Sequence, residues 1–353
     1  MSEINMLSNL WWARIFVLSF LASLLCTPLM RILSGKLRIL DTPNERKIHT
    51  FPTPLLGGLA IYAAFFIAVV YNFDFSKEMK GVAIGGTLVL LVGLVDDIRE
   101  LPATVKLLGQ LLAVSVLVWY GVRLSFLPNN LWGDIGEVIL TTIWVVGITN
   151  ALNYIDGMDG LATGCAAIFA LFLSIVALQT GQQYLGYLSI ALLGGCLGFL
   201  PYNFKLRRPA SIFLGDAGST FLGFTLASLA VMNDWAKNEP VKALSAPVLI
   251  MGVLIYDMIY TTIFRIATKK VSTVKEWLDY TGKDHLHHRL NAIGLNKKQT
   301  VLFIYLINIC LGIGAIVLRP ARTIDAVMLI FQAVVIVFLI SILERLSTQG
   351  ASE

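Results

Sequence analysis

Long apolar stretches alternate with short polar segments along the whole chain. A helix needs about 20 apolar residues to cross a bilayer, and this rule predicts about eleven membrane spans. The predicted spans are residues 11–34, 56–73, 80–95, 104–121, 136–150, 161–178, 184–200, 217–233, 243–268, 300–318 and 323–344. The third, fifth and seventh are short, so we expect them to stand nearly upright or to lie in thinned bilayer.

The composition agrees with this pattern. The 353 residues are 57% hydrophobic and 14% charged, whereas soluble domains are about 25% charged. Because no strand-like alternation and no soluble domain interrupt the spans, we predict an all-α polytopic membrane protein, with residues 1–353 as one integral membrane domain. The longest polar insertion, 265–299, is expected to be a cytosolic loop. The first span lacks a basic n-region and an A-x-A cleavage site, so we expect it to be retained.

Basic residues orient the predicted spans, because cytosolic loops are enriched in Lys and Arg. If the loop after the first span is cytosolic, the inner loops hold 19 of the 27 basic residues. The odd number of spans then places the N-terminus outside and the C-terminus inside. The net charge of +5 becomes mainly a feature of the cytosolic face, where it suits anionic headgroups or an anionic substrate.

Cysteine and glycine residues within the spans are interpreted as packing residues. The four cysteines form no C-x-x-C pair, so we expect buried small hydrophobes rather than disulfides or metal ligands. They are Cys26, Cys165, Cys196 and Cys310. Three G-x-x-x-G spacings fit close helix packing, namely Gly81/Gly85, Gly160/Gly164 and Gly194/Gly198.

Polar residues gather at the cytosolic ends of several spans. Carboxylates near hydrocarbon cost free energy, so their repeated placement indicates function. Asp96 and Asp97 end the third span and suit a general base, or a metal ligand beside a base. The alternative interpretation is a solvated helix end.

A second cluster follows the fifth span. Asn150, Asn153, Asp156 and Asp159 are three residues apart. If the helix continues, this spacing places them near one face, where two amides and two carboxylates suit hydrogen bonds to a ribose and a base. Asp159 alone is also a good N-cap for the sixth span.

A third cluster opens the eighth span. The Asp216 carboxylate suits Mg²⁺, which proteins usually hold with one or two carboxylates plus substrate phosphates. The alternative is that Asp216 is an N-cap. Phe213 beside it is either a stacking partner for a base or a packing residue.

Three of the four histidines lie in one polar segment, at His285, His287 and His288. Imidazoles donate to phosphate oxygens or bind metals, and Arg289 is a bidentate partner for phosphate. Zinc is the alternative ligand, although no cysteine lies nearby.

The first inner loop carries Lys47 and His49, which are candidates to meet a phosphate or a base carbonyl. A basic segment beside a membrane is also a topology signal. No Walker, H-E-x-x-H, G-x-S-x-G or Rossmann motif occurs, and nothing indicates nucleic-acid binding.

Together these clusters resemble the polyprenyl-phosphate N-acetylhexosamine-1-phosphate transferase family (glycosyltransferase family 4). The match covers roughly residues 40–300 in the family's order: DTPNERKIH…PLLGG, VGLVDD, NALNYIDGMDGLA, FLPYNF, FLGDAGS and DHLHHRL. Leu286 interrupts the histidine run, which is similar to the GlcNAc-1-phosphate branch and to starters of teichoic-acid and O-antigen synthesis. The phospho-MurNAc-pentapeptide translocases have three consecutive histidines.

The resemblance implies a ten- or eleven-helix bundle with a cytosolic active-site cleft in the bacterial cytoplasmic membrane. It implies transfer of an N-acetylhexosamine 1-phosphate, GlcNAc first, from a UDP-sugar to undecaprenyl phosphate, with release of UMP, as the first membrane step of a cell-envelope glycan. Mg²⁺ is the expected cofactor, with Mn²⁺ as an alternative. Whether the protein forms a homodimer stays open. The choice between direct attack and a covalent aspartyl intermediate stays open as well.

The resemblance also implies a role for each matching residue. Asp216 is the main Mg²⁺ ligand, with Asp97 as a second. Asp96 and Asp97 serve the lipid phosphate, and one of them deprotonates it. The remaining roles are a uridine pocket from Asn153, Asp156 and Asp159, stacking of Phe213 on uracil, a nucleotide or metal contact by Asn203, a phosphate contact by Lys106, and diphosphate or sugar contacts by His285, His287 and His288.

Two other protein classes remain as alternatives. A transporter with ion or proton coupling places ionisable groups near the middle of the membrane, often with internal repeats. Only Asp257 lies well inside a predicted span, with Arg265, about two turns on, as its expected partner. An intramembrane aspartyl protease shares the Tyr256-Asp257 pair, but its second motif needs glycine where this chain has Phe213, and the motif order is reversed.

Overall fold

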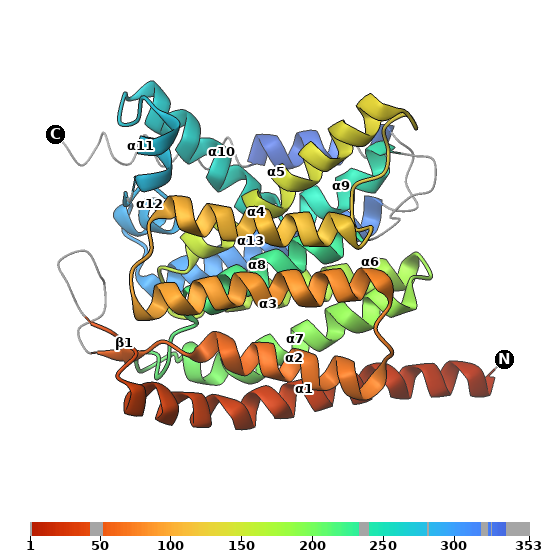
Figure 1. Ribbon diagram of the computed structural model, residues 1–353, viewed down its shortest axis with the longest axis horizontal. Coiled ribbons are helices and arrows are strands. Elements are labelled where there is room, and N and C mark those ends of the chain that lie inside the picture. Colours follow the sequence, from red (N-terminus) through yellow and green to blue (C-terminus); the bar gives the residue numbers. More distant parts are fainter. Residues whose placement is uncertain are drawn as a thin grey trace.

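The computed structural model describes residues 2–42, 52–232, 240–280, 282–318, 324–325 and 327–336. Within these ranges the chain is a bundle of helices that lie side by side (Figure 1). The elements are α1 (Ser2–Leu37), β1 (Leu40–Asp41), β2 (Thr53–Pro54), α2 (Gly57–Asn72), α3 (Lys77–Ile98), α4 (Ala103–Trp119), α5 (Leu131–Ile155), α6 (Leu161–Gln179), α7 (Gln183–Asn203), α8 (Gly215–Val231), α9 (Pro240–Ile250), α10 (Gly252–Ala267), α11 (Val274–Asp279), α12 (Leu286–Ala292) and α13 (Lys297–Leu318).

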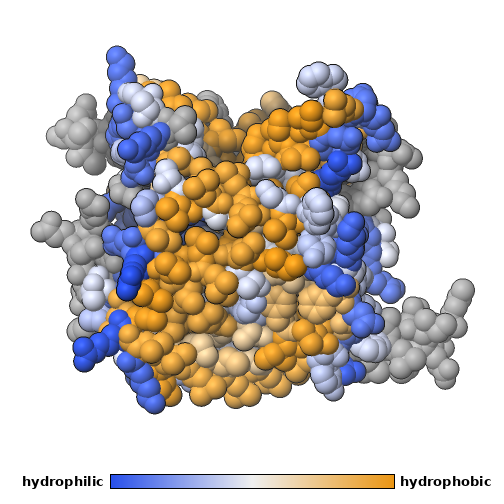
Figure 2. All heavy atoms as spheres, in the orientation of Figure 1, coloured by the Kyte–Doolittle hydropathy of each residue, from blue (hydrophilic) through white to orange (hydrophobic). Residues whose placement is uncertain are grey.

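The helices are suited to a bilayer. Six of those described are long and apolar enough to cross a membrane, in α1, α3, α5, α6, α7 and α13, and α2, α4 and Val327–Ile336 are shorter apolar helices. An apolar belt crosses the middle of the molecule between two polar ends (Figure 2). These features confirm a helical, polytopic membrane protein, while the count of eleven spans stays a prediction.

Several predicted span boundaries were wrong. The third, fifth and seventh spans are not short, because α3, α5 and α7 contain 22, 25 and 21 residues. Their helices continue into polar ends that a hydrophobicity pattern excludes. The predicted span 243–268 is two helices, α9 and α10, which meet at Met251. Pro247 and Gly252 flank that break, and both residue types favour kinks. Most of the last predicted span lies outside the described residues.

Helix α8 is the centre of the bundle. Every α8 residue except Asp216 is buried, and the helix packs against α2, α3 and α5. A helix that is apolar all round belongs in such a core. Glycine permits the closest approach, since a Cβ on Gly58 would lie 2.2 Å from the Gly218 Cα. This packing holds the N-terminal end of α8, with Asp216, against the ends of its neighbours.

A pair of two-residue strands lies beside that end of α8, although the sequence shows no strand-like alternation there. β1 pairs with β2 in antiparallel register. Backbone hydrogen bonds then join β2 and the start of α2 to the segment that leads into α8. The Phe213 N–H donates to the Pro54 carbonyl at 2.8 Å, and the Gly58 N–H donates to the Leu214 carbonyl at 2.8 Å. These backbone bonds fix the entry to α8.

The packing predictions were partly correct. A Cβ on Gly194 or Gly198 would meet the backbone oxygens of Phe16 or Phe20 in α1, so this pair does serve close packing. All four cysteines are free, as expected. Two of them, Cys165 and Cys196, are buried, but Cys310 is exposed on the surface of α13, so the expectation that all four are buried was wrong.

Candidate active site

The N-terminus of α8 is capped by a carboxylate from another helix. The Oδ1 and Oδ2 atoms of Asp97, near the end of α3, accept hydrogen bonds from the backbone N–H groups of Asp216 (2.8 Å) and Ala217 (3.1 Å). A carboxylate there satisfies orphan donors and favours the helix dipole. The alternative interpretation of Asp216 as the N-cap was wrong, since Leu214 holds that position.

The Asp216 side chain is therefore available for other contacts, and two predicted residues meet it. Lys106 Nζ lies 3.3 Å from Asp216 Oδ2 and 2.9 Å from Asp96 Oδ2. Asn153 Nδ2 donates to Asp216 Oδ1 at 3.0 Å. The structure thus brings Asp96, Asp97, Lys106, Asn153 and Asp216 together from α3, α4, α5 and α8.

Gln110 and Thr220, which the sequence did not single out, complete this cluster together with Asn150, which it did. Gln110 and Asn150 exchange two amide hydrogen bonds, of 3.2 and 2.7 Å. Thr220 donates to the Asp216 carbonyl at 2.6 Å. Gln110 and Thr220 line a small cavity together with Lys106 and Asp216. The signal that could have identified Gln110 is its position one helical turn after Lys106.

The loop after α5 corrects the prediction of a continuous polar face. The helix ends at Ile155 with Asp156 as its C-cap, so only Asn150 and Asn153 share its face. Asp159 does not cap α6, because the N-cap is Gly160 at φ +78°. The Oδ2 atom of Asp159 instead accepts a hydrogen bond from the Ala210 N–H at 2.8 Å. Desolvation raises the pKa of the Asp156 carboxyl well above its usual value, and the charge of Asp216 adds to this.

Asn203 joins two of the loops around the site. Its Oδ1 accepts from the Gly160 N–H at 3.0 Å, and its Nδ2 donates to the Ile212 carbonyl at 3.1 Å. The side chain is 3% exposed. These contacts give Asn203 a structural role, and the contact with nucleotide or metal stays a prediction.

Replacing Asn203 with alanine is expected to lower the free energy of unfolding by about 2–4 kcal/mol, because two buried backbone groups lose their partners. Thermal unfolding in detergent, followed by tryptophan fluorescence, measures the change. Asn130→Ala is the matched control, since Asn130 caps α5 with a single bond to Gly133 N and should cost about 1 kcal/mol. Equal stability of the wild type and the Asn203 variant would contradict this role.

The histidine segment lies against the loop after α5. His287 is 1% exposed, and neither of its ring nitrogens has a hydrogen-bond partner among the described residues. A Cβ on Gly157 would lie 2.6 Å from His287 Nε2, so only glycine fits there. The His287 and His288 rings are 4.1 Å apart. Burial lowers the pKa of both imidazoles, and that of His287 by more, which favours their neutral forms.

The predicted partner of Asp257 was wrong. Asp257 lies 2.7 Å from His285 Nδ1, whereas Arg265 forms two 2.8 Å hydrogen bonds with Asp284. Residues eight apart on a helix lie about 12 Å apart along its axis, which is too far for a direct ion pair. The histidine segment docks between them and separates the two charges.

The remaining predicted residues lie at the edge of the cluster or beyond it. Phe213 is half-buried where the chain enters α8. The Arg289 guanidinium lies 3.7 Å from the Tyr260 ring centroid and 3.6 Å from Asp257, so it faces α10. Lys47 and His49 lie outside the described residues.

The carboxylates around Asp216 suit a divalent cation that keeps most of its ligands from water or substrate. No group of three His, Cys, Asp or Glu side chains that could hold a metal occurs in the part of the chain that the structure describes. A single carboxylate beside a phosphate site nevertheless fits Mg²⁺, which keeps waters and substrate oxygens as its other ligands. Asp216 is such a carboxylate, and Lys106 now neutralises it. Each Asp97 oxygen accepts one N–H and has a second lone pair, which also fits.

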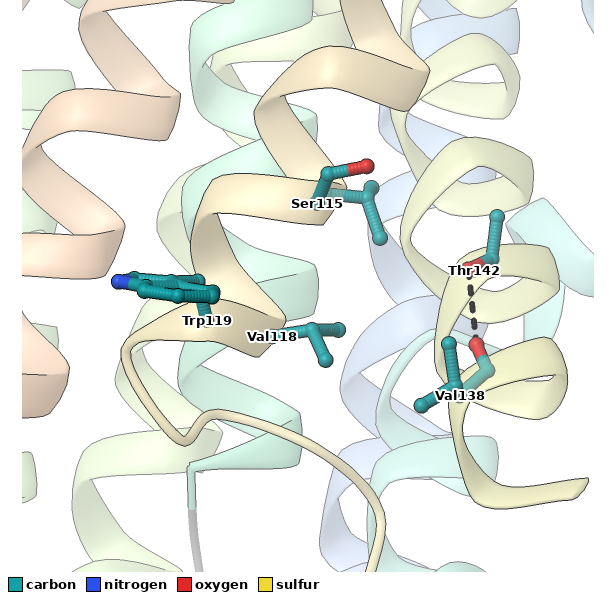
Figure 3. Close-up of a pocket in the computed structure, with 6 residues that line it drawn as sticks. Ser115, Val118, Trp119, Val138 and Thr142 are labelled. Carbon is teal, nitrogen blue, oxygen red and sulfur yellow. Dashed lines mark hydrogen bonds between the residues drawn. The ribbon is translucent and has the colours of Figure 1, made fainter. Parts of the chain in front are cut away.

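An apolar groove lies further along α4, on the seam with α5 (Figure 3). It is lined by Val114, Ser115, Val118, Trp119, Val138 and Thr142. Lys106, Gln110, Val114 and Val118 are four residues apart and so form one ridge that winds gradually around α4. This ridge begins with a cation beside the carboxylates and ends in an apolar groove.

Comparison with known proteins gives consistent matches. The family described as Glycosyl transferase family 4 matches residues 79–234. A protein of Bacillus subtilis (strain 168) called a probable undecaprenyl-phosphate N-acetylglucosaminyl 1-phosphate transferase is 35% identical, over 92% of this chain and 90% of its own. A decaprenyl-phosphate N-acetylglucosaminephosphotransferase of Mycolicibacterium smegmatis is 32% identical over 92% and 86%. A phospho-N-acetylmuramoyl-pentapeptide-transferase of Thermoanaerobacter sp. (strain X514) is 27% identical over 83% and 93%.

Proposed function

The chain belongs to glycosyl transferase family 4, and on that basis we propose that it transfers N-acetylglucosamine 1-phosphate from UDP-GlcNAc to undecaprenyl phosphate and releases UMP. The relatives with the higher identities carry names for this reaction on prenyl phosphates, and the pentapeptide transferases are less similar. The comparisons give no support to the transporter alternative.

The observation that carries the proposal is the charge arrangement around Asp216. Three carboxylates and one ammonium, from α3, α4 and α8, converge at the N-terminal end of α8. Phosphoryl transfer depends mainly on positioning and on stabilising charge at the reacting phosphorus. A carboxylate that can hold a cation, beside a lysine that can hold a phosphate, supplies both.

In the proposed reaction, a lipid phosphate oxygen attacks the β-phosphorus of the UDP-sugar. A new P–O bond forms there, the bond to the α-phosphate oxygen breaks, and UMP leaves. Asp96 is the proposed base for the lipid phosphate, because its Oδ2 faces Lys106 while both Asp97 oxygens hold α8. Mg²⁺, held by Asp216 with Asp97 as a second ligand, would neutralise diphosphate charge. One phosphoanhydride replaces another, so the reaction should be readily reversible.

The donor is proposed to lie between the loop after α5 and the histidine segment. Neither ring nitrogen of His287 has a hydrogen-bond partner in the described part of the chain, and Nε2 lies against Gly157, so His287 suits diphosphate or sugar oxygens, with His288 beside it. Asp156, Asp159 and Phe213 are the proposed uridine contacts. Asn153 orients Asp216 and lies at the border between the nucleotide and the cation.

The site is proposed to face the cytosol. The ends of α3 and α5 belong with α11, α12 and β1 at one end of the bundle, and α1 starts at the opposite end (Figure 1). That polarity supports an external N-terminus, in agreement with the excess of basic residues in the inner loops.

The apolar groove on α4 and α5 is proposed to hold the prenyl chain of the acceptor. Replacing Val118 with tryptophan should fill it and raise the KM for undecaprenyl phosphate about tenfold, by analogy with the 1–3 kcal/mol cost of overfilling a packed site. A two-isoprene acceptor should be affected less. The control is Ile263→Trp, at a lipid-facing position of α10 that is 61% exposed. An equal effect on both acceptors would contradict the placement.

The fate of the β-phosphorus tests the proposed reaction. With UDP-GlcNAc labelled at the β-phosphate, the label should appear in the lipid, and the nucleotide product should be UMP. Transfer of the sugar alone would leave the label in UDP, and this result would overturn the proposal.

A further inference from the structure

The histidine segment, residues 284–292, is held on α10 by two contacts between an acidic and a basic side chain. The proposed reaction uses neither contact. At its start, Asp284 accepts two hydrogen bonds of 2.8 Å from the Arg265 guanidinium. Both side chains are buried. Burial by itself would raise the pKa of the Asp284 carboxyl, but the bonds from Arg265 hold it below its usual value. This bidentate geometry fixes direction as well as distance.

Asp257 makes the second contact, and it bonds several groups of the segment at once. Its Oδ1 accepts from the Leu286 backbone N–H at 2.6 Å, and Arg289 Nη2 lies 3.6 Å away. Its Oδ2 lies 2.7 Å from His285 Nδ1. Asp257 is 2% exposed. A carboxylate buried in a membrane bundle is costly unless it is paired, so its placement requires these partners.

The contacts of His285 define its tautomer. Arg265 Nη2, which is always a donor, lies 3.2 Å from His285 Nε2. Nε2 must therefore accept, and the ring proton is on Nδ1, from which it is donated to Asp257. The ring also stacks on Tyr154, with centroids 5.0 Å apart. Both nitrogens of His285 are thus used within the protein.

His287 differs from His285 in each respect. Its two ring nitrogens have no partner among the described residues, and it lies against Gly157 rather than α10. His288 packs on its ring. The segment therefore has one part that bonds α10 and one part that faces the loop after α5.

We propose that Asp257 and Arg265 are positioning residues that dock the histidine segment on α10, that His285 belongs to this anchor, and that His287, with His288, is the imidazole presented to the donor diphosphate. This assignment rests on the proposed function. It changes the sequence-based role of His285 from a substrate contact to a positioning residue.

The anchor matters because α12 is too short to be stable by itself. It contains 7 residues, and isolated helices shorter than about 12 residues are marginal in water. Its orientation must come from tertiary contacts. Without the anchor, only a fraction of molecules would present His287 correctly, and the apparent affinity and rate would fall to that fraction of their full values.

Activity and hydrogen exchange of the full-length protein in detergent, measured together, test the proposal. Asp257→Ala should speed amide exchange across residues 284–292 about tenfold or more and lower kcat/KM for UDP-GlcNAc about 100-fold. His287→Ala, the matched comparison, should lower kcat/KM similarly and leave this exchange at the wild-type rate. Wild-type exchange in Asp257→Ala, or wild-type activity, would overturn the anchor.

A conservative pair of variants tests the role of His285. Asparagine keeps a donor close to the position of Nδ1 but has no counterpart of Nε2. His285→Asn should therefore recover about tenfold or more of the activity lost in His285→Ala, while His287→Asn should recover little. If His285→Asn is as inactive as His285→Ala and exchange is normal in both, the Nε2 edge acts on substrate and the proposal fails.

Two further observations keep these outcomes interpretable. Asp257→Asn retains an acceptor for Leu286 N, so it should fold even if Asp257→Ala does not. An intermediate exchange rate in this variant would support the anchor, and a wild-type rate would contradict it. If the wild-type protein transfers nothing from any UDP-sugar, the proposed function fails. The exchange data would still report on the anchor separately.

Discussion

Replacing Asp216 with asparagine is expected to lower UMP release about 10³-fold or more while the protein stays folded. The carboxylate is the proposed cation ligand, and loss of a group that stabilises transition-state charge costs about 10²–10³ even for a single donor. Folding should persist because the bond that caps α8 comes from the Asp216 backbone N–H to Asp97. The asparagine side chain also keeps an acceptor for Lys106. UMP release and thermal unfolding, measured on the same preparation, give both values.

Asp134→Asn is the control for this loss of charge. Asp134 pairs with Arg123 near the start of α5, far along that helix from the cluster, so its activity should be close to wild type. Near-normal turnover by Asp216→Asn would show that Asp216 does not hold the cation, and the proposed mechanism would fail.

Replacing Lys106 with methionine should have two opposite effects. The rate should fall about 10²–10³-fold, because a cation that serves the phosphates is lost. The affinity for a divalent cation should rise about tenfold, since the ammonium that now neutralises Asp216 is gone. The rise is modest because both side chains are partly exposed, and water weakens their attraction. Turnover measures the first effect, and electron paramagnetic resonance of free Mn²⁺ in a titration measures the second.

Lys77→Met at the start of α3 provides the comparison, because Lys77 is exposed at the other end of that helix. It should change neither quantity. Weaker Mn²⁺ binding by Lys106→Met would show that Lys106 supports the cation site rather than competing with it.

The sequence predicted the carboxylates around Asp216 because a carboxylate near hydrocarbon costs free energy, so its presence there indicates function. Asp96, Asp97 and Asp216 were recognisable as residues at span ends, and the structure brings them together. Their division of labour was not predictable. Asp97 caps α8 from α3, and a cap between residues 119 positions apart leaves no local pattern.

Spacing failed where the backbone changes direction. Asn150 to Asp159 predicted one helical face, but the helix ends at Ile155, because Gly157 and Gly160 allow the chain to turn. Asp257 and Arg265 likewise suggested a pair along one helix. The histidine segment comes later in the sequence, and its residues bond both of them: His285 pairs with Asp257, and Asp284 pairs with Arg265. Periodicity describes an isolated helix and cannot include a segment that folds back onto it.

Gln110 and Tyr154 show a third limit of the sequence. Each lies on an apolar helix and reads as an ordinary polar or aromatic residue. Their roles beside Asn150 and His285 appear only when α4, α5 and the histidine segment are adjacent. Neutral residues within a site therefore need the three-dimensional arrangement to be found.

The most direct test is UMP release by the purified protein given UDP-GlcNAc. The proposed reaction predicts release only when undecaprenyl phosphate and Mg²⁺ are both present, loss of release with EDTA, and recovery when Mg²⁺ is restored. Release with a different UDP-N-acetylhexosamine would keep the mechanism and change the sugar. No release with any UDP-sugar in well-folded protein, or release that does not need the lipid, would contradict the proposed function.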